Sequence, residues 1–472
     1  MRDWTINPGI TLGQTWSDNV APNSGGFDQS DFITQINPEL RANLNGRRIQ
    51  ADLDYQLQNI LYARNDRSTT YQQYLARAGA EVLPEHFFID TSSTLTQQII
   101  STSGVRTNNN YTITDNRTDQ LTASIRPSWH QSLGSNAESL LDYEHGIVKY
   151  DSDKVAGTTS DSQLDSVSLT ANSLSEERRL SWKVNVADQR INYDDNAFDD
   201  LKIRHAGLLL GYQIIPGFSP LALIGYEDND FGDNIGSTDP KGSFWGVGFR
   251  WQPNTRTDLE ALAGHRFFGN TYRVDWRQRG RYLTSELTYT EEIQGEATSA
   301  LESASLIDNP SVPSAFTLGV SGNAFLSKTV RASAILKKSK TSITVTPFYG
   351  KREFSDSSQD ESVGGIEGTW TWDFASRTNF GVKLHWDTTD AATGSENQTF
   401  AYSTLQLQRR LGNQAMASLQ YSYTRADSDD KQLAYSENAI TAQLTYLFGT
   451  PPKEVPEPSV RHTRSQQREL QF

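Results

Sequence analysis

The sequence contains no cysteine, so disulfide bonds, thiolate metal sites and catalysis by a thiol are excluded. Basic residues are fewer than acidic ones, with 43 Lys and Arg compared with 57 Asp and Glu, and the net charge is -14. Nucleic-acid-binding proteins usually present a basic face, so this balance argues against a nucleic-acid partner. No run of about 18 apolar residues is present, and the sequence therefore offers no candidate for a transmembrane helix.

These absences leave one class of membrane protein open. A hydrophobic fraction of 36% and a mean hydropathy of -0.60 would suit a soluble protein. They suit a transmembrane β-barrel equally well, because its strands show only every second residue to lipid. The chain is rich in the amphipathic aromatic residues that line membrane interfaces, with 10 Trp and 19 Tyr.

Apolar residues occupy every second position in many short segments, which is the pattern of a strand with one apolar face. Near the end of the chain, Ile440 and Leu444 belong to such a face, while Thr441 and Gln443 lie on the other. The same alternation recurs at 4–16, 32–44, 49–57, 121–129, 180–186, 206–214, 245–251, 380–386 and 415–423. We count about 22 candidate strands, within a range of about 18 to 24.

Long polar connections alternate with short ones along the chain. "DNVAPNSGGFDQ" and "DSDKVAGTTSDSQ" are of the long kind, and "NGR", "PGFS" and "KKSK" are of the short kind. Bacterial outer-membrane barrels sort their connections in this way, with the short turns in the periplasm. The sequence therefore predicts an all-β fold, a transmembrane antiparallel up-and-down β-barrel over residues 1–449 with both termini periplasmic. Residues 450–472 are expected to form a flexible periplasmic tail.

The amino terminus bears on location. Met1, Arg2 and Asp3 are followed at once by a strand pattern, without the basic and apolar regions of a signal peptide. An outer-membrane protein needs such a leader, so we interpret the sequence as a mature form located in the cell outer membrane. The expected partners are outer-membrane lipid, lipopolysaccharide and the barrel-assembly machinery, whose recognition signal the aromatic last strand resembles.

Aromatic side chains of the apolar parity predict two interfacial girdles, which include Trp4, Trp16, Trp245, Trp251, Tyr446 and Phe448. The opposite parity of three central strands turns basic side chains into the lumen. This lumen basic patch consists of Arg250, Arg266, Arg273, Arg277 and Arg279, and its acidic partners are Glu260, Asp275 and Glu286. The patch either pairs with these carboxylates and braces the wall or draws anionic solutes into a pore.

The longest connection, roughly residues 292–322, contains "EATSALESASL". Its residues Ala297, Ala300, Leu301 and Ala304 have helical spacing. A barrel of about 22 strands encloses a lumen wide enough to require a plug. We therefore expect this segment to fold inward, and the sequence offers no other candidate for a plug.

Two segments resemble the PEP-CTERM system-associated outer-membrane barrels, a porin-type family found near exopolysaccharide and protein-sorting genes. "WTINPGITLGQTWSDNV" is similar to the family's amino-terminal signature at Trp4, Ile6, Pro8, Trp16, Asp18, Asn19 and Val20. "RWQPNTRTDLEALAGHRFFG" is similar to its central motif at Arg250, Trp251, Pro253, Arg256, Thr257, Leu259 and residues 264–269. The resemblance implies an envelope location and a role in exopolysaccharide export or assembly, with polysaccharide or export-system components as partners. It carries over no catalytic residues.

The favoured function is therefore an outer-membrane pore for exopolysaccharide export or solute passage. A structural or docking barrel with a sealed lumen, which binds envelope partners, is the alternative. An enzyme is disfavoured, because the sequence has no phosphate-binding loop, no H-E-x-x-H and no G-x-S-x-G. The acidic segment 228–233 lacks the ligand spacing of a calcium loop, and we expect neither a metal nor a cofactor.

Overall fold

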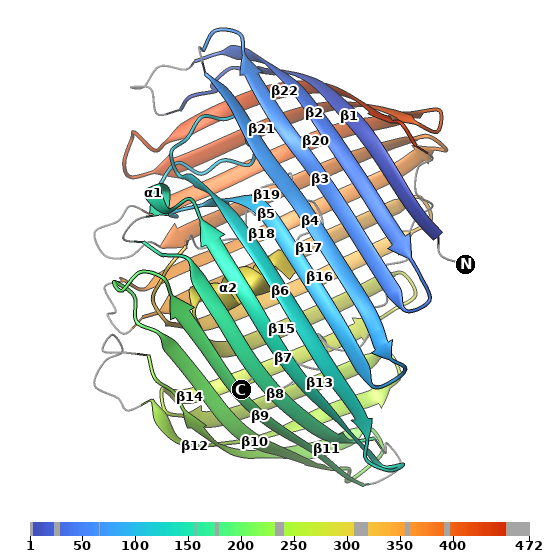
Figure 1. Cartoon of the computed structure of the whole chain (residues 1–472), viewed down its shortest axis with the longest axis vertical. Helices are drawn as coiled ribbons and strands as arrows, with labels where there is room; N and C mark the ends of the chain where they lie inside the picture. Colours follow the sequence, from blue (N-terminus) through green and yellow to red (C-terminus); the bar gives the residue numbers. More distant parts are fainter. Residues whose placement is uncertain are drawn as a thin grey trace.

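The computed structural model describes residues 3–22, 29–65, 67–155, 158–174, 179–231, 240–305, 320–354, 359–390 and 397–449. In these residues, 22 antiparallel strands form one closed barrel. Each strand pairs with its neighbours in the sequence, and the last strand pairs with the first. Figure 1 shows the tilted strands and places helix α2 between the front and back walls. The predicted antiparallel barrel of about 22 strands is confirmed.

The elements have the following bounds. The strands are β1 (Asp3–Ser17), β2 (Asp31–Asn45), β3 (Ile49–Tyr62), β4 (Ser68–Leu83), β5 (Phe87–Ile99), β6 (Arg117–Ser132), β7 (Ala137–Tyr150), β8 (Ser162–Ser173), β9 (Leu180–Tyr193), β10 (Leu201–Tyr212), β11 (Phe218–Asp228), β12 (Lys241–Asn254), β13 (Thr257–Arg266), β14 (Gly269–Arg279), β15 (Leu283–Gln294), β16 (Phe325–Lys338), β17 (Thr341–Glu353), β18 (Glu361–Ala375), β19 (Thr378–Asp390), β20 (Gln398–Leu411), β21 (Ala415–Ser428) and β22 (Tyr435–Leu447). The helices are α1 (Ser152–Val155) and α2 (Glu296–Ser305). Neither helix in the described part of the chain is long and apolar enough to cross a membrane.

Connections of two kinds separate the strands. One end of the barrel carries short turns, such as 46–48, 339–340 and 376–377, and we call it the short-turn end. The other end, the long-connection end, carries segments such as 100–116 and 295–324. The two-residue turn between β13 and β14 is an exception at the long-connection end. The start of β1 and the end of β22 both lie at the short-turn end, whereas the predicted tail over 450–472 lies outside the described residues.

The barrel closes between its first and last strands. The register of β1 and β22 runs from Gly9 opposite Leu447 to Ser17 opposite Ala439. On the inner side of this seam, hydroxyl groups meet across the strands, with 2.8 Å between the Oγ1 atoms of Thr11 and Thr445 and 2.9 Å between those of Thr15 and Thr441. Such cross-strand pairs fix the register, because a slip of one residue would turn every side chain to the opposite face.

The apolar side chains lie on the outside of the barrel and the polar side chains on the inside. Along β1, Trp4 and Leu12 are exposed, whereas Asn7 and Thr15 are buried at 2% and 0% exposure. All the residues expected in the aromatic girdles are exposed on the outer face, with Trp4, Trp251, Tyr446 and Phe448 towards the short-turn end and Trp16 and Trp245 towards the long-connection end. This reversal of the usual soluble pattern is what a barrel surrounded by lipid requires.

Buried apolar residues form three clusters inside the barrel, all towards the long-connection end. The first contains Val148, Tyr150, Ile191, Phe198, Ala297 and Ala300, the second Val20, Ile33, Ile60, Tyr111 and Ala439, and the third Val105, Phe400, Tyr402, Ala426 and Tyr435. Each cluster combines wall residues with residues of a long connection. The interior at this end is therefore packed with the chain's own connections.

The face alternation predicts the effect of a charge on either side of one strand. Leu419 of β21 is 53% exposed on the outer face, and its neighbour Gln420 faces the lumen. Leu419→Arg should lower the free energy of unfolding by about 2 kcal/mol, since a charge on the lipid face loses its hydration. Gln420→Arg is the matched control and should cost little. The measurement is reversible denaturant unfolding in lipid vesicles, and equal losses for the two variants would contradict the assignment of faces.

Candidate functional site

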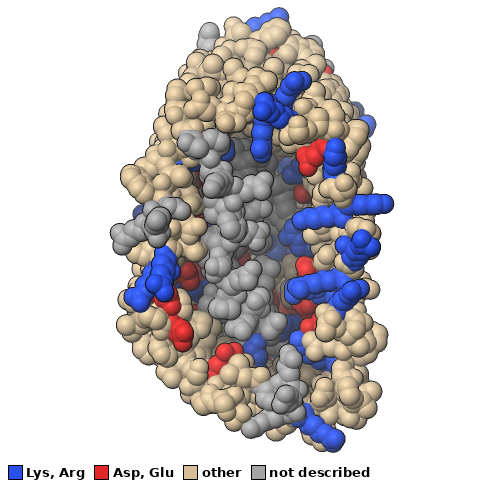
Figure 2. All heavy atoms as spheres, turned by 90° about the vertical axis from the view of Figure 1, so that its right-hand side faces the viewer, with Lys and Arg blue, Asp and Glu red and all other residues tan. Residues whose placement is uncertain are grey.

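Lumen-facing side chains towards the short-turn end of the barrel, such as Arg250 and Arg277, are partly exposed. Figure 2 looks at this end and shows an elongated opening with Lys and Arg side chains along its edge and Asp and Glu among them. The inward parity of the strands places these charged groups there, because the outward parity is taken by apolar residues. The candidate site is this lumen together with the segments that cross it.

The arginines of the lumen basic patch lie on the inward parity of β12, β13 and β14. Arg250 pairs with Asp258 at 2.8 Å, although Glu260 is the residue opposite it in the strand register. Arg277 lies 3.0 Å from Glu286. All four side chains of these two pairs are 40–45% exposed, so each pair contributes at most about 1 kcal/mol to stability.

Arg266 lies deeper in the barrel wall. It pairs with Glu227 of β11 at 2.6 Å, and the two side chains are 5% and 1% exposed. The guanidinium group also lies 5.0 Å from the centre of the Phe268 ring. Gly242 stands opposite Glu227 on the intervening strand β12 and places no side chain between the partners.

The remaining members of the patch occupy different depths. Arg273 is buried, whereas Arg279 is exposed beside the turn between β14 and β15. Glu260 and Asp275 are opposite each other on β13 and β14. Of the acidic partners that the sequence predicts, Glu286 pairs with Arg277, whereas Arg250 and Arg266 pair with Asp258 and Glu227. Anion selection by the patch stays a prediction.

Two carboxylates of this wall were missed by sequence analysis. Asp258 shares the inward parity of Glu260, and the same parity argument would have found it. Glu227 is two strands away from Arg266, so its contact depends on the register of β11, β12 and β13 together. No spacing within the sequence indicates that contact.

The connection between β5 and β6, residues 100–116, crosses the interior. Its Arg106 forms a bidentate pair with Asp387 of β19, with Nη1–Oδ1 at 2.6 Å and Nη2–Oδ2 at 2.8 Å. The two side chains are 3% and 0% exposed. His385 lies 2.6 Å from Asp387 through Nε2 and stacks on Tyr402 at 4.9 Å. Removing one member of a buried pair of this kind costs about 3–5 kcal/mol, because the other charge is left without a partner.

The same connection is also fastened to β22 and β3, on the two sides of the barrel seam. Thr112 donates a hydrogen bond to Glu437 of β22 at 2.8 Å, and Asn110 donates one to Gln58 of β3 at 2.9 Å. The backbone carbonyl of Tyr111 accepts a hydrogen bond from the Tyr62 hydroxyl at 2.7 Å. Residues 100–116 thus leave β5, cross the interior to β19 and β22, and return to β6.

Helix α2 forms a second inward segment, and it lies against β5, β6, β7 and β8. Its Ala297 and Ala300 are buried, and Leu301 occupies the space beside Gly146, where a Cβ atom would lie 2.4 Å from its side chain. Glu296 accepts hydrogen bonds from the Tyr150 hydroxyl at 2.5 Å and from the Ser321 backbone at 3.1 Å. Burial raises the pKa of the Glu296 carboxyl, and the Arg352 guanidinium opposes this effect.

The two inward segments meet. The backbone N–H of Val320, which follows α2, donates to the carbonyl of Ile100 at 3.1 Å. The N–H of Gly322 donates to Thr158 of the β7–β8 connection at 2.9 Å. Together they form a layer of protein across the long-connection end of the lumen.

The expectation that α2 folds inward is confirmed for residues 296–304, which pack on the inner wall. Residues 306–319 of the same connection lie outside the described residues. The expectation that the sequence offers no other plug is wrong, because residues 100–116 also cross the lumen. Their Asn-rich and Thr-rich sequence has no periodicity, and its apolar residues are only Ile100, Val105, Tyr111 and Ile113 within a polar run.

Comparison with known proteins supports the fold. No protein-family model and no curated protein matches the sequence. Among solved structures, the FrpB iron transporter from Neisseria meningitidis aligns with a TM-score of 0.50 at 10% identity, over 94% of this chain and 82% of that one. The siderophore receptor PirA from Pseudomonas aeruginosa aligns with a TM-score of 0.48 at 10% identity, over 94% and 80%. At this identity the likeness to the iron transporter concerns the barrel fold alone.

Proposed function

We propose that the chain is an outer-membrane barrel whose lumen is a solute pathway closed by two of its own connections. The observation that carries the proposal is that the obstruction consists of residues 100–116 and α2, held by side-chain and backbone hydrogen bonds, and not of the barrel wall. Segments held in this way are separable from the wall without opening the strand ladder. The short turns and both chain ends then lie in the periplasm, as in bacterial outer-membrane barrels.

The solute class follows from the polar, charged lining of the lumen. Such a wall suits hydrophilic solutes, since charged groups in a narrow passage act on ions strongly. The exopolysaccharide role implied by the family resemblance is supported by neither the fold nor the comparisons. Catalysis is not part of the proposal.

A sealed docking barrel is the second candidate. The observation that favours it is the three apolar clusters at the long-connection end, which bury residues of the inward segments against the wall. A permanent seal would use packing of this kind. The two candidates differ in what happens when the inward segments are removed.

Replacing residues 102–114, or 296–322, or both, by short Gly-Ser linkers tests the pathway. In each case the flanking strands are neighbours, so a short linker closes the gap. We expect low single-channel conductance for the wild type in planar bilayers, an increase for each replacement and an increase of several-fold for both together. Heat-modifiable migration on gels verifies the folded barrel. A folded double replacement with wild-type conductance would establish the docking barrel.

Charge selection is tested separately with Arg273→Ser combined with Arg277→Ser. If the lumen basic patch selects anions, the reversal potential under a salt gradient should lose its anion preference. If the patch braces the wall, thermal stability should fall while selectivity stays constant. The reversal potentials with and without the two substitutions are compared in the protein in which linkers replace both residues 102–114 and residues 296–322. In that protein ions reach the patch from both sides.

A further inference from the structure

Basic residues cluster at the four short turns that follow β14, β16, β18 and β20. They are Arg281, Lys337, Lys338, Lys340, Arg377, Arg409 and Arg410, and we call them the basic arc. The strands from β14 to β21 are consecutive neighbours, so the four turns lie side by side on one rim. In Figure 2 basic side chains protrude along the right side of the opening, which is the back wall of Figure 1.

The basic arc has few acidic residues beside it. One of them is Asp373, whose backbone N–H donates a hydrogen bond to the carbonyl of Lys340 at 2.8 Å. The segments 278–284, 337–342, 374–379 and 409–416 contain no Asp or Glu. All members of the arc are exposed. Within the described residues, none of them forms an ion pair with a carboxylate. The basic arc is a local excess of positive charge on a chain whose net charge is -14, and such a patch attracts anions from outside the protein.

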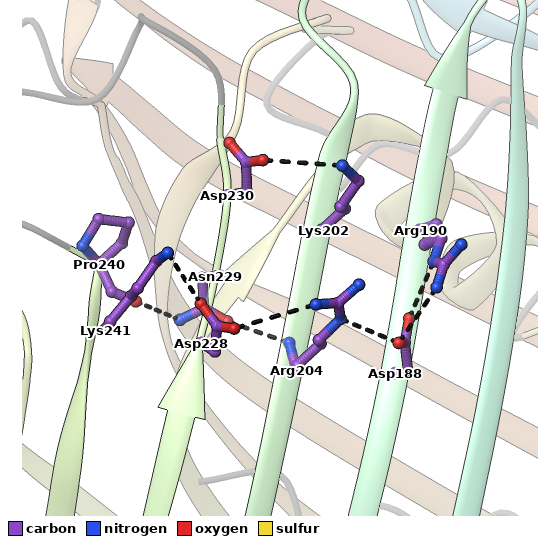
Figure 3. Close-up of polar contacts among 9 residues, drawn as sticks. All are labelled: Asp188, Arg190, Lys202, Arg204, Asp228, Asn229, Asp230, Pro240 and Lys241. Carbon is purple, nitrogen blue, oxygen red and sulfur yellow. Dashed lines mark hydrogen bonds and ion pairs between the residues drawn. The ribbon is translucent and has the colours of Figure 1, made fainter.

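Cations of the outer face towards the long-connection end form ion pairs, unlike those of the basic arc. Figure 3 shows four cations of β9, β10 and β12, here called the paired row, each facing a carboxylate. The pairs are Arg190–Asp188 at 3.2 Å, Arg204–Asp188 at 2.9 Å, Lys241–Asp228 at 3.2 Å and Lys202–Asp230 at 3.7 Å. Carboxylates of the protein itself thus neutralise all four cations of the paired row, and the basic arc departs from that arrangement.

Aromatic residues fix the depth of the basic arc. Trp370, Trp372 and Phe374 of β18 are exposed on the outer face close to the arc, and the two Trp rings stack at 6.3 Å. At the turn between β14 and β15, the centre of the Tyr282 ring lies 5.0 Å from the guanidinium of Arg281. Aromatic belts of this kind sit at the membrane interface, so groups just beyond them lie at the depth of lipid headgroups.

We propose that the basic arc binds anionic phospholipid headgroups of the adjoining leaflet, whose phosphates supply the missing negative charge. Clusters of four to eight Lys and Arg next to a membrane-spanning segment are typical of such binding. The proposal rests on the proposed membrane location but not on the pore. The chain's own tail is a poor substitute, because residues 450–472 contain Lys453, Arg461, Arg464 and Arg468 against Glu454, Glu457 and Glu469.

Two variants with the same change in formal charge test the proposal. The arc variant carries Lys337→Gln, Lys338→Gln, Lys340→Gln and Arg377→Gln. The control carries Arg190→Gln, Lys202→Gln, Arg204→Gln and Lys241→Gln, which removes the paired row. Binding of phosphatidylglycerol and of phosphatidylcholine to the folded barrel in neutral detergent is titrated by native mass spectrometry. We expect the wild type and the control to prefer phosphatidylglycerol by about tenfold at low salt, and the arc variant to lose that preference.

Three results would overturn the proposal. The first is a wild type that binds phosphatidylglycerol no better than phosphatidylcholine. The second is an equal loss of the phosphatidylglycerol preference in the arc variant and the control. The third is a wild type that binds soluble polyphosphate more tightly through the arc than it binds phosphatidylglycerol vesicles. The first two place the lipid contact elsewhere, and the third makes the partner a soluble polyanion. Conductance is measured on the same preparations, so that a failure of the pore proposal is separated from a failure of lipid binding.

Discussion

The structure depends on one constraint, which is that backbone N–H and C=O groups surrounded by hydrocarbon must all find partners within the protein. A sheet meets this condition only when it has no edge, and the pairing of β1 with β22 removes the edge. An antiparallel ring of 22 strands brings the start of β1 and the end of β22 to the same rim. It also gives each strand one face towards lipid and one towards the lumen, which explains why Trp4 is exposed while Asn7 is buried.

The same constraint decides what the interior is made of. Because the lipid face takes the apolar residues, the inner face is polar, and its buried groups must satisfy one another. At the seam they do so through pairs such as Thr15 and Thr441. At the long-connection end, the Arg106–Asp387 pair and the Glu296–Tyr150 hydrogen bond draw two connections inward. Towards the short-turn end, charged pairs such as Arg277 and Glu286 remain partly exposed to water. The described residues thus pack the lumen at the long-connection end and leave charged pairs towards the short-turn end partly exposed.

How much of this the sequence predicts depends on the range of the interactions. The strands, their faces and the two kinds of connection follow from alternation over neighbouring residues, and α2 follows from helical spacing. The second inward segment does not, because Arg106 and Asp387 are 281 positions apart and the residues between them contain no signal of their contact. The pairing of Arg266 with Glu227 could not be predicted either, because the two residues lie on strands separated by β12 and their contact depends on the register of three strands. Local pattern determines the barrel wall, and long-range pairing determines the lumen.

The absence of cysteine allows the central claim to be tested directly, because each introduced thiol reports alone. Gln408 faces the lumen towards the short-turn end, whereas Thr424 faces it beneath the β5–β6 connection, with a hydrogen bond to Asn108 at 3.2 Å. A membrane-impermeant maleimide should modify Gln408→Cys quickly in the reconstituted barrel and leave Thr424→Cys unmodified from either side. Replacing residues 102–114 should make Thr424→Cys reactive. Equal modification rates at the two positions in the intact protein would contradict a lumen closed at one end by its own connections.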